Sequence, residues 1–239
     1  MISIEYKHKE IKVNIGEMPS YIPTPLTLKI VNPVSKRVTW SVQEYGFELY
    51  KKFYYYILSL KSKGIQPKGV AIGTHDGEFG EWVPLVISNH TDATLVEASN
   101  NQFKELEKNY SKYKNVKLLN LLVTKDGKPT PFWEGGKGYT NSIVKRVPEA
   151  QEIEPINPTI YPSININKLI NDKIDWLHLD VEGYDHILIK SLKNLPNCII
   201  FEWENLLTEE LEDIKNFLTN KGYKLDFENN VSCLALKTN

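Results

Sequence analysis

The sequence lacks several features that mark common classes of protein. It contains no repeat, no low-complexity tract and no apolar run long enough to span a bilayer. The first ten residues have no apolar core of a secretory signal, so we expect a cytoplasmic protein. The formal net charge is only −1, so no overall field favours nucleic acid as a partner. These absences favour a globular protein with no transmembrane segment.

Cysteine is scarce, with only two in 239 residues. Cys198 and Cys233 lie in apolar, strand-like runs without metal-site spacing, so we expect buried free thiols rather than a disulfide. Aromatic residues, by contrast, are concentrated in residues 45–56, which read YGFELYKKFYYY. A membrane-interface role and a sugar-stacking role are both open for this segment. We expect instead a helix that packs its rings on the core.

The order of apolar runs predicts an α/β fold in two parts. Residues 1–66 hold β-rich runs and a helix over 46–63. We expect an N-terminal extension, for which a lid, a homodimer contact and an acceptor site are all open. The second domain, residues 67–239, alternates strands with helices, which predicts a mostly parallel sheet with helices on both faces. Its strands are expected at 69–74, 93–99, 115–124, 174–181 and 198–204, its helices at 100–113, 184–195 and 208–221, and an antiparallel hairpin at 223–238.

Ligands of such sheets bind beyond the carboxyl ends of the strands. The first strand leads into Gly73, Thr74, His75, Asp76 and Gly77, and the two glycines permit a bend and the close approach of a ligand. A plain turn is the alternative.

The second strand ends at Glu97, the only charge in an apolar run. At this position a carboxylate can accept both hydrogen bonds of a ribose diol, although a solvated strand end is the alternative. The fingerprint G-x-G-x-x-G and the Lys–Ser/Thr of a phosphate loop are both absent, which disfavours an NAD-dependent enzyme. A cofactor with ribose and adenine but no phosphate fits better, and S-adenosylmethionine (SAM) is the commonest such ligand.

The segment IDWLHLDVEGYD, residues 174–185, carries the densest set of ionisable groups. His178 and Asp180 share one face of a strand, because side chains repeat every two residues, and Glu182 follows at its exit. Any of the three could remove the proton of an acceptor hydroxyl, or position the acceptor, during methyl transfer. A capping role for Asp180 and a solvated Glu182 are the alternatives. A divalent cation bound by Asp180, Glu182 and Glu202 is a minor option without a compact motif.

The stretch 125–162 interrupts the alternation of strands and helices and is rich in glycine and proline. A long irregular loop inside a compact domain is usually functional. The candidate contacts to an acceptor substrate are Tyr139, Thr140, Asn141 and Ser142 in this loop and Glu202 at the end of the fifth strand. A mobile polar loop is an equally good interpretation.

The region 68–225 resembles the FkbM-type SAM-dependent methyltransferases. Their pattern is a strand into G-x-x-x-G, a strand ending in Glu, a strand with a D-x-E-G exit and another strand ending in Glu. The matching segments here are IGTHDGEFG, LVEAS, LHLDVEGYDHILIKSL and IIFEWE. The resemblance implies a Rossmann-like class I methyltransferase fold with seven strands. It also implies O-methylation, often of a hydroxyl on a saccharide, a glycan or a related natural product.

The resemblance also implies where SAM lies. Gly73 to Gly77 would surround its methionine part, Glu97 would bind its ribose, and Leu122 and Val123 would lie beside the adenine. Ala98 and Asp180 are further candidate contacts to the cofactor. Asp180 and Glu182 would face the reaction centre.

The chain departs from the family pattern at three positions. Ala71 stands where an acid usually heads the glycine loop, with Asp76 as the candidate to compensate. Asn167 stands just before the fourth strand, where the family usually has Asp, and His178 replaces a usual lysine. The first departure motivates a second hypothesis, a methyltransferase-like fold that has lost catalysis and serves as a binding or scaffold module.

Overall fold

The protein is built on a seven-stranded sheet with the strand order β14-β15-β13-β12-β5-β6-β7. The computed structural model describes residues 2–6, 9–13, 27–31, 38–78, 80–134, 141–144, 158–170, 173–227 and 231–238. The sheet strands are β5 (Lys68–Ile72), β6 (Asp92–Glu97), β7 (Val116–Asn120), β12 (Trp176–Leu179), β13 (Cys198–Glu202), β14 (Tyr223–Asp226) and β15 (Ser232–Lys237). β15 runs antiparallel to both of its neighbours, and the other pairs are parallel. The predicted parallel sheet with an antiparallel C-terminal hairpin is therefore confirmed.

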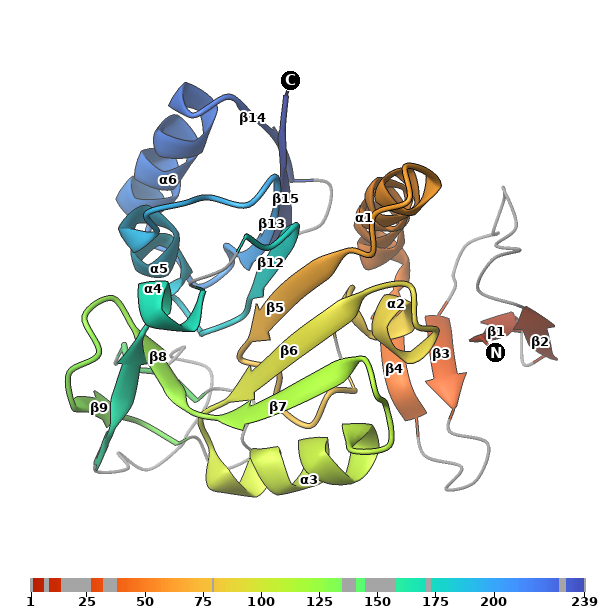
Figure 1. The fold of residues 1–239 in the computed structure, drawn as a ribbon, viewed down its shortest axis with the longest axis horizontal. Coiled ribbons are helices and arrows are strands. Elements are labelled where there is room, and N and C mark those ends of the chain that lie inside the picture. Colours follow the sequence, from red (N-terminus) through yellow and green to blue (C-terminus); the bar gives the residue numbers. More distant parts are fainter. Residues whose placement is uncertain are drawn as a thin grey trace.

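Helices cover both faces of this sheet (Figure 1). The helices of the first face are α1 (Glu44–Ser62), α2 (Val83–Ile87) and α3 (Asn100–Tyr110), and those of the second are α4 (Ile166–Leu169), α5 (Asp185–Ser191) and α6 (Thr208–Asn220). The strands are apolar on both sides, because each side faces a separate hydrophobic core. Among the described residues, no helix combines the length and the apolar character needed to cross a membrane.

The aromatic segment forms most of α1 and packs on the first core, as expected. Tyr50 and Phe53 are fully buried, and the Phe53 ring meets Trp176 of β12 edge-on with centroids 5.6 Å apart. Tyr55 faces solvent at 60% exposure. The helix thus buries one side of its aromatic run against the sheet, as amphipathic helices do.

The N-terminal strands form a separate antiparallel sheet in the order β2-β1-β3-β4. They are β1 (Ile2–Tyr6), β2 (Lys9–Val13), β3 (Thr27–Val31) and β4 (Val38–Gln43).

The structure differs from expectation at residues 115–124, which were predicted to form one strand. They form β7 and then β8 (Leu122–Thr124), which leaves the main sheet and pairs in parallel with β11 (Ser163–Asn165). The break follows Asn120, whose side-chain amide donates to the carbonyl oxygens of Glu97 and Ala98 at 2.9 and 3.0 Å. The loop beyond β8 also holds β9 (Thr130–Phe132), which pairs with β10 (Thr159–Tyr161).

Candidate active site

A cavity opens at the carboxyl ends of β5, β6 and β12, where an open α/β sheet is expected to bind its ligand. The sequence-predicted residues in its wall are Gly73, Thr74, His75, Glu97, Ala98, Leu122, Val123, Asn141, Ser142, Asp180 and Glu182. The wall residues that the sequence did not point to are mostly apolar: Ile72, Val96, Leu121, Phe132, Ile143, Val181 and Tyr184. Their only signal was a position at a strand end or in the irregular loop.

Four predicted residues lie outside this wall, and two lie outside the described residues. Asp76, Gly77, His178 and Glu202 do not line the cavity, whereas Tyr139 and Thr140 fall in the undescribed segment 135–140.

Gly73 turns the chain from β5 into the cavity. Its φ is +79°, and a Cβ atom built there would lie 1.7 Å from the main-chain oxygen of Asp180. Only glycine fits so close to the exit of β12 with this backbone conformation. The Gly73 N–H also donates to the Val96 carbonyl at 3.0 Å, which fixes the start of the loop against β6.

The outer half of the loop is held against α3. The Tyr110 hydroxyl donates to the Gly77 carbonyl at 2.7 Å, and the Asn109 amide donates to the Asp76 carbonyl at 2.8 Å. The Asp76 carboxylate accepts the Glu78 N–H at 3.0 Å. Asp76 and Gly77 therefore support the loop from behind the cavity wall.

Glu97 presents a fixed carboxylate to the cavity. Its two oxygens each accept one backbone N–H at 2.8 Å, from His75 and from Ser99. Burial raises the pKa of Glu97, and the hydrogen bonds from Ser99 and His75 partly oppose this shift. A carboxylate oxygen has two lone pairs, so each oxygen keeps one acceptor position for a ligand hydroxyl. This pair of acceptor positions fits the ribose hydroxyls of SAM, and Leu122, Val123 and Phe132 give the apolar surface that an adenine ring needs.

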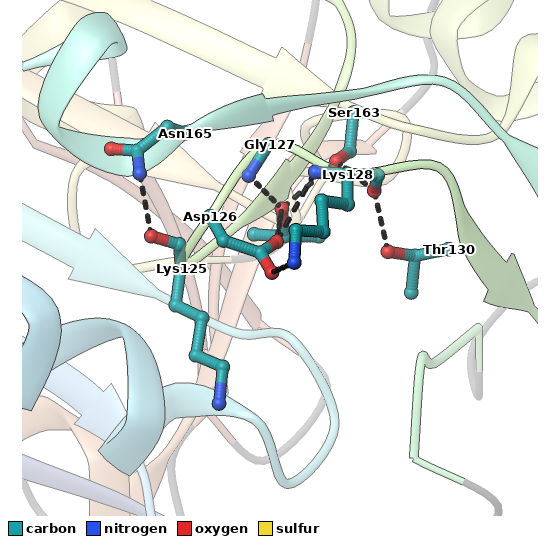
Figure 2. Close-up of polar contacts among 8 residues, drawn as sticks. Lys125, Asp126, Gly127, Lys128, Thr130, Ser163 and Asn165 are labelled. Carbon is teal, nitrogen blue, oxygen red and sulfur yellow. Dashed lines mark hydrogen bonds and ion pairs between the residues drawn. The ribbon is translucent and has the colours of Figure 1, made fainter.

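A network of polar contacts holds β8 in place beside the cavity (Figure 2). The Thr124 hydroxyl accepts the Gly127 N–H at 2.9 Å and lies 2.8 Å from the Ser163 hydroxyl. The Asn165 amide donates to the Lys125 carbonyl at 2.6 Å, as Figure 2 shows. The turn after β8 is thereby tied to β11, which keeps Leu122 and Val123 in the wall.

Three carboxylates gather where β12 and β13 end. One carboxylate oxygen from each of Asp180, Glu182 and Glu202 lies within 4.8 Å of the other two. At this distance two negative charges repel by about 3 kcal/mol at an effective dielectric constant of 20. Burial, with the charges of Asp180 and Asp185, raises the pKa of Glu182 to about 8. Burial and the charges of Asp180 and Glu182 raise the pKa of Glu202 to about 11. Protonation of Glu202 at neutral pH therefore relieves part of the repulsion.

Asn205, which the sequence analysis missed, links two of these carboxylates. Its amide nitrogen donates to Glu182 at 2.7 Å and to Glu202 at 3.1 Å. Asp180, Glu182 and Glu202 form a group compact enough for a cation, but Asn205 already supplies a donor to two of the three. We assign no metal ligand here.

His178 lies beneath the site rather than in its wall. It is buried on β12, and its Nε2 is 3.0 Å from a carboxylate oxygen of Glu81, which is buried too. Burial alone would lower the pKa of His178, but the hydrogen bond and charge of Glu81 raise it above the ordinary value. Glu81 was missed because it lies 97 positions away in the chain, and no motif joins the two.

The family follows from a sequence match that covers more than half of the chain. The sequence profile of the methyltransferase FkbM domain matches residues 60–225. The protein belongs to the FkbM methyltransferase family. It is accordingly a methyltransferase with a Rossmann-like fold, and its cofactor is SAM.

Solved structures of methyltransferases and of an rRNA-processing protein resemble the chain at low identity. The Methanococcus jannaschii fibrillarin pre-rRNA processing protein is 12% identical, with a TM-score of 0.42 over 72% of this chain and 66% of that chain. The SAH-bound Podospora anserina methyltransferase PaMTH1 is 10% identical, with a TM-score of 0.43 over 77% of both chains. The ribosomal protein L11 methylase of Lactobacillus delbrueckii subsp. bulgaricus is 13% identical, with a TM-score of 0.38 over 77% of both. No curated protein matches the chain significantly.

Proposed function

We propose that the protein transfers the methyl group of SAM to a hydroxyl of a saccharide or a related polyol natural product. The observation that carries the proposal is Glu182, a carboxylate in the cavity wall whose pKa burial raises to about 8. A general base works best when its pKa lies near the operating pH. The pKa of Glu182 lies close to neutral pH, and its carboxylate lies beside those of Asp180 and Glu202.

In this proposal some residues of the cavity wall bind SAM, and Glu182 acts on the acceptor. Glu97 would hold the ribose hydroxyls, and Leu122, Val123 and Phe132 would enclose the adenine. When bound, SAM supplies a methyl group that is activated by a positively charged sulfur. The Glu182 carboxylate accepts the proton of the acceptor hydroxyl, while the hydrogen bond from Asn205 keeps one of its oxygens oriented.

The preference for a polyol is supported by the polar groups around Glu182. The polar residues Asp180, Glu182 and Asn141 border the cavity. Carboxylates accept several hydrogen bonds, and hydroxyl-rich acceptors donate several. This chemistry agrees with the saccharide substrates that the family resemblance implies.

The alternative, a catalytically inactive binding or scaffold module, was motivated by Ala71. In the structure Ala71 is fully buried inside β5 and is not part of the cavity wall. The wall keeps its carboxylates without an acid at this position. We therefore retain transfer as the proposal, with the inactive module as an outcome of its test.

The test is methyl transfer to a panel of acceptors that differ in the reacting atom. The protein and SAM are incubated with neutral glycosides, polyols, phenols and amines, S-adenosylhomocysteine (SAH) is quantified, and NMR locates the methyl group in any product. We expect an O-methyl product from a hydroxyl-rich acceptor. Glu182→Gln should reduce turnover about 100-fold or more, the usual contribution of a general base.

A matched control shows whether the loss is specific. Glu105→Gln removes a carboxylate that pairs with Lys108 on an exposed face of α3, and its turnover should equal that of the wild type. Transfer only to nitrogen would contradict O-methylation. SAM binding without transfer to any acceptor would support the inactive module instead.

A further inference from the structure

The turn after β12 has a backbone conformation that needs support. Glu182 has a φ of +55° and is followed by Gly183 with a φ of +91°. A positive φ is easy for glycine but uncommon for a residue with a side chain. Among the described residues only His75, Asn89 and Glu182 adopt it without being glycine. Some contact must therefore hold the main chain of Glu182.

Ser142 makes that contact. Its hydroxyl donates to the main-chain carbonyl of Glu182 at 2.8 Å and accepts the N–H of Val144 at 2.9 Å. Ser142 is itself anchored, because its main chain exchanges two hydrogen bonds with Trp133, at 2.8 and 3.0 Å. The residue is only 5% exposed. The buried hydroxyl of Ser142 therefore hydrogen-bonds the main chain of Glu182, where φ is positive.

We propose that Ser142 is a positioning residue, which holds the left-handed backbone of Glu182 and thereby directs its carboxylate toward Asn205 and the cavity. The Ser142 hydroxyl hydrogen is engaged by the Glu182 carbonyl, so Ser142 acts through Glu182 rather than by donating to the acceptor. This inference rests on the proposed function only in that Glu182 is taken as the base.

The hydrogen bonds of Ser142 to Trp133 and to Glu182 also connect two parts of the cavity wall. Trp133 directly follows β9, whose Phe132 belongs to the apolar part of the cavity wall. Ser142 therefore connects the wall that would enclose the adenine with the turn that carries the base.

The kinetic test compares Ser142→Ala with Ser142→Thr. We expect the alanine variant to lose at least about tenfold in kcat while the Kd for SAM stays within about twofold, because only the base is misplaced. The threonine variant keeps the hydroxyl and should recover most of the loss. Ser62→Ala, at the exposed end of α1, is the matched control and should behave as the wild type.

A second readout needs no activity. The ¹³Cα and ¹³Cβ shifts of Glu182 report its backbone conformation, and we expect the left-handed signature in the wild type and Ser142→Thr but not in Ser142→Ala. If the alanine variant does not fold, Ser142→Cys, with its weaker donor, should show a partial loss of the signature.

Two results would overturn the proposal. One is an alanine variant with an unchanged Glu182 signature and wild-type kcat. The other is parallel loss of SAM affinity and kcat with that signature retained, since it would show a merely structural role. If the wild type methylates no acceptor, the proposed function fails, while the chemical shifts still decide the role of Ser142.

Discussion

Glu97→Gln tests whether the buried carboxylate binds the cofactor. Its two oxygens are equivalent acceptors in the wild type, each bonded to one N–H at 2.8 Å. Glutamine replaces one oxygen by a donor, so one ligand hydroxyl loses its acceptor and the other meets a neutral one. A hydrogen bond to a charged group contributes about 1.5–3 kcal/mol. We therefore expect the Kd for SAM and for SAH to rise about 10- to 100-fold.

Calorimetry with both ligands measures this effect, and thermal unfolding without ligand checks the fold. One backbone N–H, of His75 or Ser99, would face the new amide donor, which costs about 1–3 kcal/mol. Removal of a buried charge offsets part of this cost. The unfolding temperature should therefore change by only a few degrees, and Glu105→Gln serves as the exposed control. Binding of SAM to Glu97→Gln within twofold of the wild type would refute the assigned role.

Three further predictions follow from the same geometry. The kcat of methyl transfer should rise with pH and reach half its plateau at about pH 8, because Glu182 must be ionised to accept a proton. A kcat that stays constant from about pH 6 to 9 would exclude Glu182 as the base. Gly73→Ala should abolish SAM binding in calorimetry, because its Cβ would meet a main-chain oxygen at 1.7 Å, whereas Gly64→Ala, with a similar positive φ but open space, should bind normally. Glu81→Gln should lower the unfolding temperature more at pH 6 than at pH 9. Because the pKa of His178 is raised in the folded protein, its pairing with Glu81 stabilises the fold fully below the unfolded pKa of about 6.5, and this contribution is lost as the pH rises through the folded pKa. An equal decrease in unfolding temperature at pH 6 and pH 9 would contradict the pairing of His178 with Glu81.

The sequence was sufficient to predict the main sheet because its strands are continuous apolar runs between amphipathic helices. The same pattern could not show where residues 115–124 divide. The strand divides just after Asn120, whose side-chain amide donates to the carbonyl of Glu97 at the end of β6 and to that of Ala98 beyond it. Such a contact depends on tertiary structure and leaves the apolar pattern unchanged.

Residues of the cavity wall were predictable where the strand order alone brings them together. Gly73, Glu97 and Asp180 lie at the carboxyl ends of strands that are neighbours in the sheet, so one rule about carboxyl ends finds them all. Glu81 and Asn205 were missed because their partners are set by loop conformation. His178 shares a face with Asp180, yet its Glu81 partner and its burial place it behind the cavity wall.

The most direct test of the proposed cofactor site is a crystal structure of the protein with SAH. We expect both ribose hydroxyls to donate to the Glu97 carboxylate, the adenine to lie against Leu122, Val123 and Phe132, and the sulfur to face Glu182. SAH bound with its ribose away from Glu97, or in a different part of the molecule, would contradict this expectation.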